Sequence, residues 1–186
     1  MPAVRKSPTL RDLPEKIQSL LRDAPSPSQA ANYLQRLVEA AGAESIRRFS
    51  SAHLPKLLRL LGSSSYLSEI LIRQGKSWPK FFLDQLVITP KTVAEHLKEL
   101  EPLLKRVSSL DEVCAVLRRH KQREYLRIGT KDLEPSGTLE ETVRELTALA
   151  GASLEAAYRY CRAEVEEDFG ELLLPGKTDR NGFVCQ

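Results

Sequence analysis

The fold is decided by residues 139–169, LEETVRELTALAGASLEAAYRYCRAEVEEDF, where apolar side chains recur at spacings of three and four. Such spacing puts these side chains on one face of an α-helix. The face comprises Leu139, Val143, Leu146, Ala150, Leu154, Ala157, Cys161, Val165 and Phe169. At ~1.5 Å per residue, the helix would be roughly 50 Å long, and its small residues in the middle leave room for another backbone. We therefore expect the spine of a helical bundle, with this face as its packing face.

The rest of the chain shows the same spacing and almost no β-branched alternation, so the predicted fold class is all-α, a multi-helix bundle. The expected helices span residues 10–23, 28–41, 44–61 with a break at Pro55, 64–74, 79–86, 90–107 with a kink near Pro102, 111–133 and 139–172. Cap signatures mark helix starts, because their side chains can satisfy free backbone N–H groups. They are Ser26 with Pro27 and Gln29, Thr89 with Pro90, Ser109 with Glu112, Thr138 with Glu141, and the serines before Tyr66.

Composition limits the class of protein. The chain has 186 residues, with 28 Lys and Arg against 25 Asp and Glu, which gives a net charge of +3. This charge is too small to require a polyanionic partner, and no run approaches the ~18 apolar residues of a membrane-spanning helix. Cys114, Cys161 and Cys185 show no CxxC spacing, and the N-terminus lacks the apolar run of a signal peptide. We therefore expect a cytoplasmic protein without a membrane partner.

The end of the chain changes in character. Residues 175–182 have the composition of an exposed turn, and Phe183 to Cys185 begin a pattern typical of a strand. Because a lone strand is not stable, we expect the chain to stop at the start of a truncated α/β domain. The predicted organisation is an N-terminal helical region (1–107), a pair of long helices packed on it (108–174), and a linker with the first strand of the missing domain (175–186).

Charge distinguishes the last two predicted helices. From Arg118 to Lys131 there are six Lys or Arg residues and one acid, whereas from Thr138 to Glu171 there are nine acids and three arginines. The two helices can therefore attract one another, which competes with binding of an external polyanion. Aromatic side chains for base stacking are scarce in the basic run, so nucleic acid is disfavoured as a partner.

Arg123, Glu124 and Arg127 form the candidate site. Glu124 and Arg127 fall on a helix face that begins apolar, where charges are costly to bury unless they are paired. Their spacing of three allows such pairing. We expect a polar network, flanked by Arg123, against the helix of Glu141 and Glu145 or against a domain beyond this chain. A solvated helix end and direct contact with a nucleotide phosphate are the alternatives.

Residues for metal chemistry show no recognisable pattern. His53, His96 and His120 fall on separate predicted helices without a second ligand three or four positions away, so we expect ordinary surface or half-buried histidines. The sequence contains no Asp-x-Asp pair of the kind that magnesium-dependent nucleotidyl transfer uses. We therefore predict no catalytic residues, no metal ligands and no bound cofactor in this chain.

Three segments together resemble a known family. They are Leu61–Leu67 (LGSSSYL), Leu117–Ile128 (LRRHKQREYLRI) followed by Asp132 and Leu133, and Leu139–Ala150 (LEETVRELTALA). The region from about Leu57 to Phe169 resembles the helical part of the N-terminal half of glutamine synthetase adenylyltransferases, the bifunctional adenylyl-transferring and adenylyl-removing enzymes. In that family the helical part leads into a polymerase-beta-like nucleotidyltransferase domain, whose magnesium-binding aspartates have no counterpart in this sequence.

The resemblance implies a parent enzyme of nitrogen metabolism. That enzyme would use ATP and magnesium to adenylylate a tyrosine of glutamine synthetase, and phosphate to remove the group, under control of the PII signal protein. This chain would be a scaffold for the missing nucleotidyltransferase domain, with no activity by itself. A free-standing helical adaptor that binds a protein partner is the first alternative, and a small basic nucleic-acid-binding module is the second.

Overall fold

The computed structural model describes residues 15–47, 49–86 and 89–170, and over these ranges all regular secondary structure is helical, with no strand. The helices are α1 (Glu15–Arg22), α2 (Pro27–Ala41), α3 (Glu44–Arg47), α4 (His53–Ser63), α5 (Ser65–Ile72), the 3₁₀-helix η2 (Gly75–Ser77), α6 (Trp78–Asp84), α7 (Val93–Leu104), α8 (Leu110–Asp132) and α9 (Leu139–Phe169). The all-α prediction is confirmed for the described part of the chain. The strand expected at residues 183–185 lies outside it. None of the described helices is both long and apolar enough to cross a membrane.

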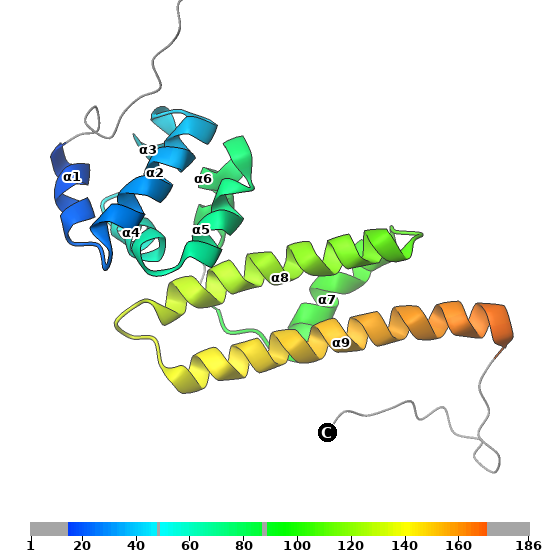
Figure 1. The fold of residues 1–186 in the computed structure, drawn as a ribbon. Helices are drawn as coiled ribbons and strands as arrows, with labels where there is room; N and C mark the ends of the chain where they lie inside the picture. Colours follow the sequence, from blue (N-terminus) through cyan, green and yellow to red (C-terminus); the bar gives the residue numbers. More distant parts are fainter. Residues whose placement is uncertain (1–14, 48, 87–88, 171–186) are drawn as a thin grey trace, which may run out of the picture.

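The helices from α1 to α6 pack around one hydrophobic core (Figure 1). Leucines of α2, α4 and α5 fill it, and Trp78 and Phe82 of α6 close it. The indole N–H of Trp78 donates to the carbonyl oxygen of Leu37 at 3.0 Å, so this ring is buried with its donor satisfied. Phe49 stacks on the same ring, with centroids 5.3 Å apart. This core gives α8 a firm surface to pack on.

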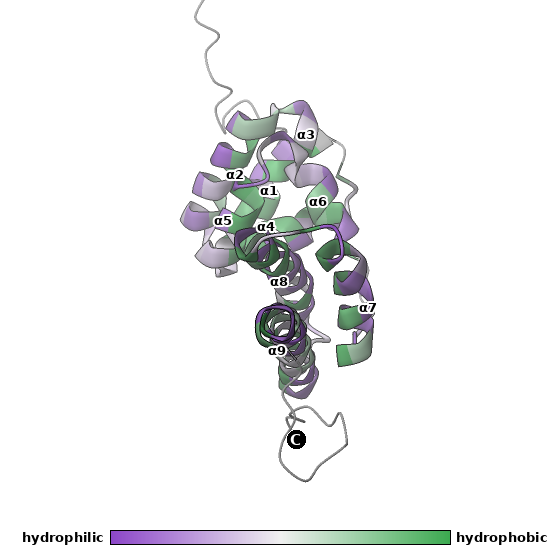
Figure 2. Cartoon of the chain, turned by 90° about the vertical axis from the view of Figure 1, so that its right-hand side faces the viewer, coloured by the Kyte–Doolittle hydropathy of each residue, from purple (hydrophilic) through white to green (hydrophobic). Residues whose placement is uncertain are grey.

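The other three helices, α7, α8 and α9, form an elongated arm (Figure 1). α8 and α9 are an antiparallel pair, and α7 lies along one side of that pair and contacts both helices (Figure 2). α8 joins the arm to the first core, because its Leu126 is buried there, while its Val116 packs with Leu100 and Ala156 in a second, smaller core. The boundaries expected at residues 107 and 174 stay a prediction.

The large apolar residues predicted to face the bundle from α9 do not pack there, whereas the close packing predicted for its small middle residues is confirmed. The buried residues of α9 are Glu145, Leu149, Ala152 and Ala156. Its large exposed apolar residues, here called the α9 stripe, are Leu139, Val143, Leu146, Leu154, Tyr158, Val165 and Phe169. Leu139, Leu154 and Phe169 are 72%, 67% and 84% exposed. At ~100° per residue, the two faces lie roughly 160° apart around the helix. α9 thus packs on α7 and α8 through two alanines, one leucine and an acid.

The predicted helix start at Thr89 and Pro90 is also wrong. α7 begins at Val93, with Thr92 as its N-cap. The hydroxyl of Thr92 accepts from the backbone N–H of Glu95, and the carboxylate of Glu95 accepts from the backbone N–H of Thr92 at 2.7 Å. This capping box sets the start of the helix, because it satisfies two backbone donors that the helix itself leaves free.

α2 begins at Pro27 as predicted, but without the expected capping box. Ser26 makes no side-chain cap bond, and the amide of Gln29 donates instead to the carbonyl oxygen of Leu61 at 2.9 Å. The two segments approach closely because Gly62 has no side chain: a Cβ there would lie 3.1 Å from the backbone nitrogen of Ser26. The side chain of Gln29 thus bonds to α4 and does not cap α2.

Three other N-caps are confirmed, since the hydroxyls of Ser64, Ser109 and Thr138 each accept from the backbone N–H three residues further on. The capping box expected for Ser109 and Glu112 is altered, because the carboxylate of Glu112 accepts from the backbone N–H of Ser108. The break expected at Pro55 falls earlier, because α4 already begins at His53. Proline is tolerated in the first turn of a helix, where its missing N–H has no intrahelical partner to lose.

Candidate functional site

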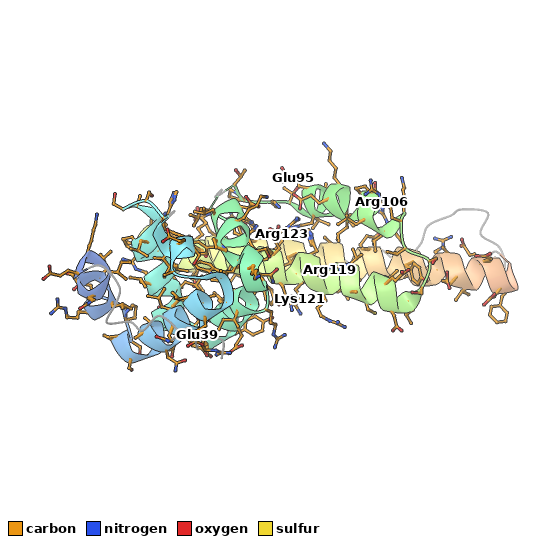
Figure 3. The ribbon with its side chains drawn as sticks, turned by 90° about the horizontal axis from the view of Figure 1, so that it is seen from above. Glu39, Glu95, Arg106, Arg119, Lys121 and Arg123 are labelled. Atoms are coloured by element: carbon orange, nitrogen blue, oxygen red, sulfur yellow. The ribbon has the colours of Figure 1, made fainter. Side chains whose placement is uncertain are left out.

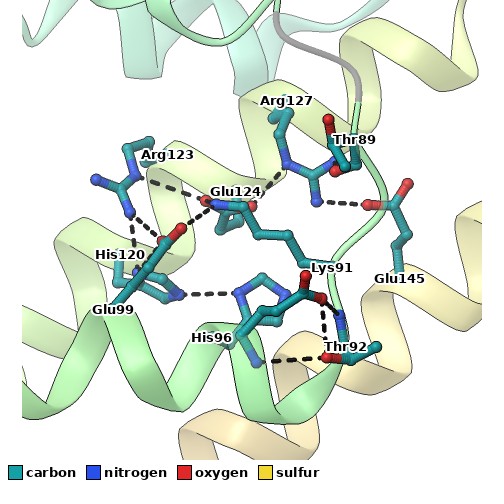
Figure 4. A network of polar contacts seen from close by, with 11 residues as sticks. Thr89, Lys91, Thr92, His96, Glu99, His120, Arg123, Glu124, Arg127 and Glu145 are labelled. Carbon is teal, nitrogen blue, oxygen red and sulfur yellow. Dashed lines mark hydrogen bonds and ion pairs between the residues drawn. The ribbon is translucent and has the colours of Figure 1, made fainter.

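A buried polar network ties the arm together (Figure 4). Its members are Thr89 and Lys91 before α7, His96 and Glu99 in α7, His120, Arg123, Glu124 and Arg127 in α8, and Glu145 in α9. They converge because His120, Glu124 and Arg127 follow one another at spacings of four and three, which places them on one face of α8. α7 and α9 pack on this face of α8 and bring the other members of the network to it.

Glu124 is at the centre of the network and is fully buried. Its carboxylate accepts from Lys91 Nζ at 2.8 Å and from Arg127 Nε at 2.7 Å. Burial by itself would raise the pKa of this carboxyl group, but the hydrogen bonds from Lys91 and Arg127 outweigh it and lower the pKa to about 2. Glu124 is therefore an anion over the whole physiological pH range.

Arg127 connects three segments of the chain. Besides its bond to Glu124, its Nη1 donates to the carbonyl oxygen of Thr89 at 3.1 Å, and its Nη2 lies 2.5 Å from a carboxylate oxygen of Glu145. Burial would lower the pKa of this guanidinium, and its bonds to the two glutamates raise it. One buried cation thus holds α8, α9 and the segment before α7 together.

The charge contrast between the last two helices is partly neutralised within the molecule, where the end of α8 meets the start of α9. Lys131 Nζ lies 3.1 Å from Glu141 and 3.6 Å from Glu145, one turn beyond the Arg127 pair. Together the two pairs couple the basic half of α8 to the acidic start of α9.

Arg123 flanks the network and is the most exposed of the three predicted site residues, with 37% of its side chain accessible. Its Nη2 donates to Glu99 at 2.7 Å, and its Nε lies 3.6 Å from Glu124. The structure thus brings Arg123, Glu124 and Arg127 together, with Glu145 as the partner on α9. Their role toward a further domain stays a prediction.

The expectation of ordinary surface or half-buried histidines is wrong for two of the three. His96 and His120 are both buried, and Nδ1 of His96 lies 3.1 Å from Nε2 of His120. Burial lowers the pKa of both rings, that of His120 to about 4, so both are neutral at pH 7. The spacing of four between His120 and Glu124 was the sequence signal for this cluster.

Ligand atoms of His96, His120 and Glu124 lie within 4.8 Å of one another, which in residue type suits a transition metal. Charge opposes this use, because Lys91 and Arg127 already pair with Glu124 and a divalent ion would meet both cations. Magnesium fits still less, since it prefers oxygen ligands and the carboxylates of this network are engaged by Lys or Arg. The geometry is that of a network of ion pairs that joins α7, α8 and α9.

Comparison with known proteins gives a family match over most of the chain. A family model described as glutamate-ammonia ligase adenylyltransferase matches residues 54–185. Several relatives carry the name bifunctional glutamine synthetase adenylyltransferase/adenylyl-removing enzyme. The one from Pseudomonas aeruginosa is 26% identical over 166 residues, which cover 88% of this chain and 16% of the relative. The one from Nitrosococcus oceani is 33% identical over 131 residues, covering 68% and 13%.

A third relative of the same name, from Psychromonas ingrahamii, is 24% identical over 190 residues and covers 97% of this chain. Only 20% of that relative is matched, so the chain spans a fifth or less of the length of the three relatives. No solved structure matches the chain.

Proposed function

This chain belongs to the glutamate-ammonia ligase adenylyltransferase family, and from this premise we propose that it is a helical scaffold which holds a nucleotidyltransferase domain of the enzyme in place. The carboxylates of the polar network are all in ion pairs and so are not available as the metal ligands that nucleotidyl transfer uses. The chain would contribute support and orientation to the enzyme, and the reaction itself would occur on the other domain.

The observation that carries this proposal is the α9 stripe. Seven large apolar side chains on one helix are exposed, while the helix packs through a different face. Exposed apolar surface of this extent is characteristic of a face that another protein surface covers, since burying it stabilises by ~25 cal/mol per Å². A nucleotidyltransferase domain continuing from the end of α9 is the occupant to which the family points.

The buried network supports the same proposal. α9 can position a domain only if its own orientation is fixed, and the ion pairs of Glu145 with Arg127 and Lys131 fix it against α8. The apolar contact of Ala156 with Leu100 and Val116 adds a second point of attachment further along α9. The first two thirds of α9 are thus attached to α7 and α8, which holds that part of the stripe in place.

The proposal extends to the setting of the whole enzyme. ATP and magnesium would be bound by the nucleotidyltransferase domain, and no step would involve residues of this chain. Glutamine synthetase, which the names of the relatives give as their substrate, would be the protein modified, and the PII signal protein would regulate the reaction in the cytoplasm.

Two measurements test this function. The chain alone, incubated with phosphate, magnesium and adenylylated glutamine synthetase, should release no ADP. When the chain is continued by the nucleotidyltransferase domain, Leu154→Glu should lower this adenylyl removal, whereas Arg118→Glu, on an exposed position of α8, should not. ADP release by the chain alone would contradict the scaffold. Tight binding of the chain to glutamine synthetase without the domain would instead support a protein-binding adaptor.

A further inference from the structure

A pocket of about 320 Å³ opens between α6, α7 and α8, beside the polar network. Its lining residues are Phe81, Leu103, Val116, Arg119, His120 and Arg123. This volume lies at the lower end of the range of small-molecule sites, which are about 300–1,000 Å³. The apolar part of the lining comes from three helices, with Phe81 on α6, Leu103 on α7 and Val116 on α8. The apolar walls of the pocket therefore come from three different helices.

The polar part of the lining is basic. Arg119 and Arg123 lie one turn apart on α8. Figure 3 labels both arginines, and it labels Lys121 on the opposite edge of the same helix. None of the six lining residues is acidic. No described carboxylate forms an ion pair with Arg119, which is exposed. The pocket therefore has an available guanidinium at its rim.

Arg123 is held in position by its other contacts. Glu99 accepts from its Nη2 at 2.7 Å, and Nδ1 of the buried His120 lies 3.3 Å from the same nitrogen. A guanidinium has five N–H donors, so these contacts leave others for a ligand. A donor that is fixed before binding loses little side-chain entropy when a ligand arrives.

We propose that this pocket binds a small organic anion, with a carboxylate or phosphate group held by Arg119 and Arg123 and an apolar body packed against Phe81, Leu103 and Val116. Guanidinium groups match the planar, multi-oxygen shape of such anions, and the apolar walls provide the contact that an inorganic ion cannot use. This inference does not depend on the scaffold function, because α9 takes no part in the pocket.

The probe is phenyl phosphate, titrated into the full chain and followed by calorimetry and by NMR. Phenylacetate replaces the phosphate by a carboxylate, inorganic phosphate lacks the apolar body, and benzyl alcohol lacks the charge. We expect one saturable site for at least one of the two organic anions, with shifts of the His120 ring signals. Loss of one charged hydrogen-bond partner should weaken binding about tenfold in Arg119→Gln.

Arg118→Gln is the matched control, since Arg118 is exposed and lies on the side of α8 away from the pocket, at ~100° per residue. It should change affinity by less than about twofold. Leu154→Ser should leave binding unchanged, which separates the pocket from the α9 stripe. The proposal is overturned if neither organic anion shows saturable binding, or if inorganic phosphate or benzyl alcohol binds as tightly as the organic anions. Equal effects of Arg118→Gln and Arg119→Gln on affinity would also overturn it.

Discussion

At the scale of single residues, the arm depends on the pairing of buried charges. Glu124 is fully buried, and Arg127 is nearly so, yet each has partners from more than one segment. A buried ion pair adds little to the free energy of unfolding when it is compared with apolar residues of similar size. Removing one partner, however, leaves a buried charge with too little compensation at a site that water reaches poorly. The expected effects of substitution are therefore large and asymmetric.

Replacing Glu124 by alanine should lower the free energy of unfolding by on the order of 3 kcal/mol, because Lys91 and Arg127 lose the carboxylate between them and keep only Glu99 and Glu145, respectively, as counter-charges. Urea denaturation measures the change. Asp84→Ala is the control: Asp84 pairs with Lys80 at 3.0 Å on the surface of α6, and its loss should cost less than about 1 kcal/mol. Similar small losses in both variants would contradict a buried network.

Stability should fall as the pH drops from 6.5 towards 4, because of His120. In the unfolded chain this imidazole takes up a proton near pH 6.5, whereas burial keeps its pKa at about 4 in the folded chain. The unfolded state therefore binds more protons across this window, and acidification favours it. The depressed pKa of His96 acts in the same direction. The contribution of Glu124 is lost at lower pH, as the pH falls towards its own pKa of about 2.

Unfolding free energies measured between pH 7 and pH 4.5 test this point. His120→Gln should flatten the profile, and His53→Gln, at the start of α4 and outside the cluster, should preserve it. An unchanged slope in His120→Gln would show that the buried pair does not control acid stability.

At the scale of elements, α9 shows what the sequence could and could not predict. Its existence and start follow from local chemistry, since Thr138 caps it and apolar residues recur at helical spacing. Its packing face could not be predicted by counting apolar residues. The neighbouring α8 presents Arg127 and Lys131, and Glu145 on the other face of α9 pairs with both.

A matched pair of substitutions tests which face of α9 is buried. Leu149→Ala should cost about 2–5 kcal/mol, because it leaves a cavity against α7 and α8. Leu154→Ala makes the same change on the α9 stripe and should stay within about 0.5 kcal/mol. A larger loss of stability in Leu154→Ala than in Leu149→Ala would show that the face predicted from the apolar spacing is the buried one.

The same limit applies to the polar network. The Glu124 and Arg127 pair could be predicted because the two residues are three apart on one helix. Lys91 and His96 lie 33 and 24 residues from their partners, and they reach them only because α7 folds back onto α8. Such contacts depend on the path of the chain between helices, which local spacing does not encode.

At the scale of the whole molecule, an N-terminal helical core carries an arm whose longest helix displays apolar side chains to solvent. The family membership explains this arrangement if the arm supports a nucleotidyltransferase domain. The all-α class and the family could both be predicted from sequence, because they depend on helical spacing and on three short segments. The surface that the arm offers became visible only when the true packing face of α9 was known.

The accessibility of Cys161 tests the scaffold most directly. Cys114 on α8 and Cys161 on α9 are both exposed free thiols, and Cys161 belongs to the apolar face predicted for α9. In this chain both should react with iodoacetamide at similar rates, measured by mass spectrometry of the two peptides. When the chain is continued by the nucleotidyltransferase domain, Cys161 should react about tenfold more slowly while Cys114 is unchanged. Equal reactivity of Cys161 with and without the domain would contradict the account.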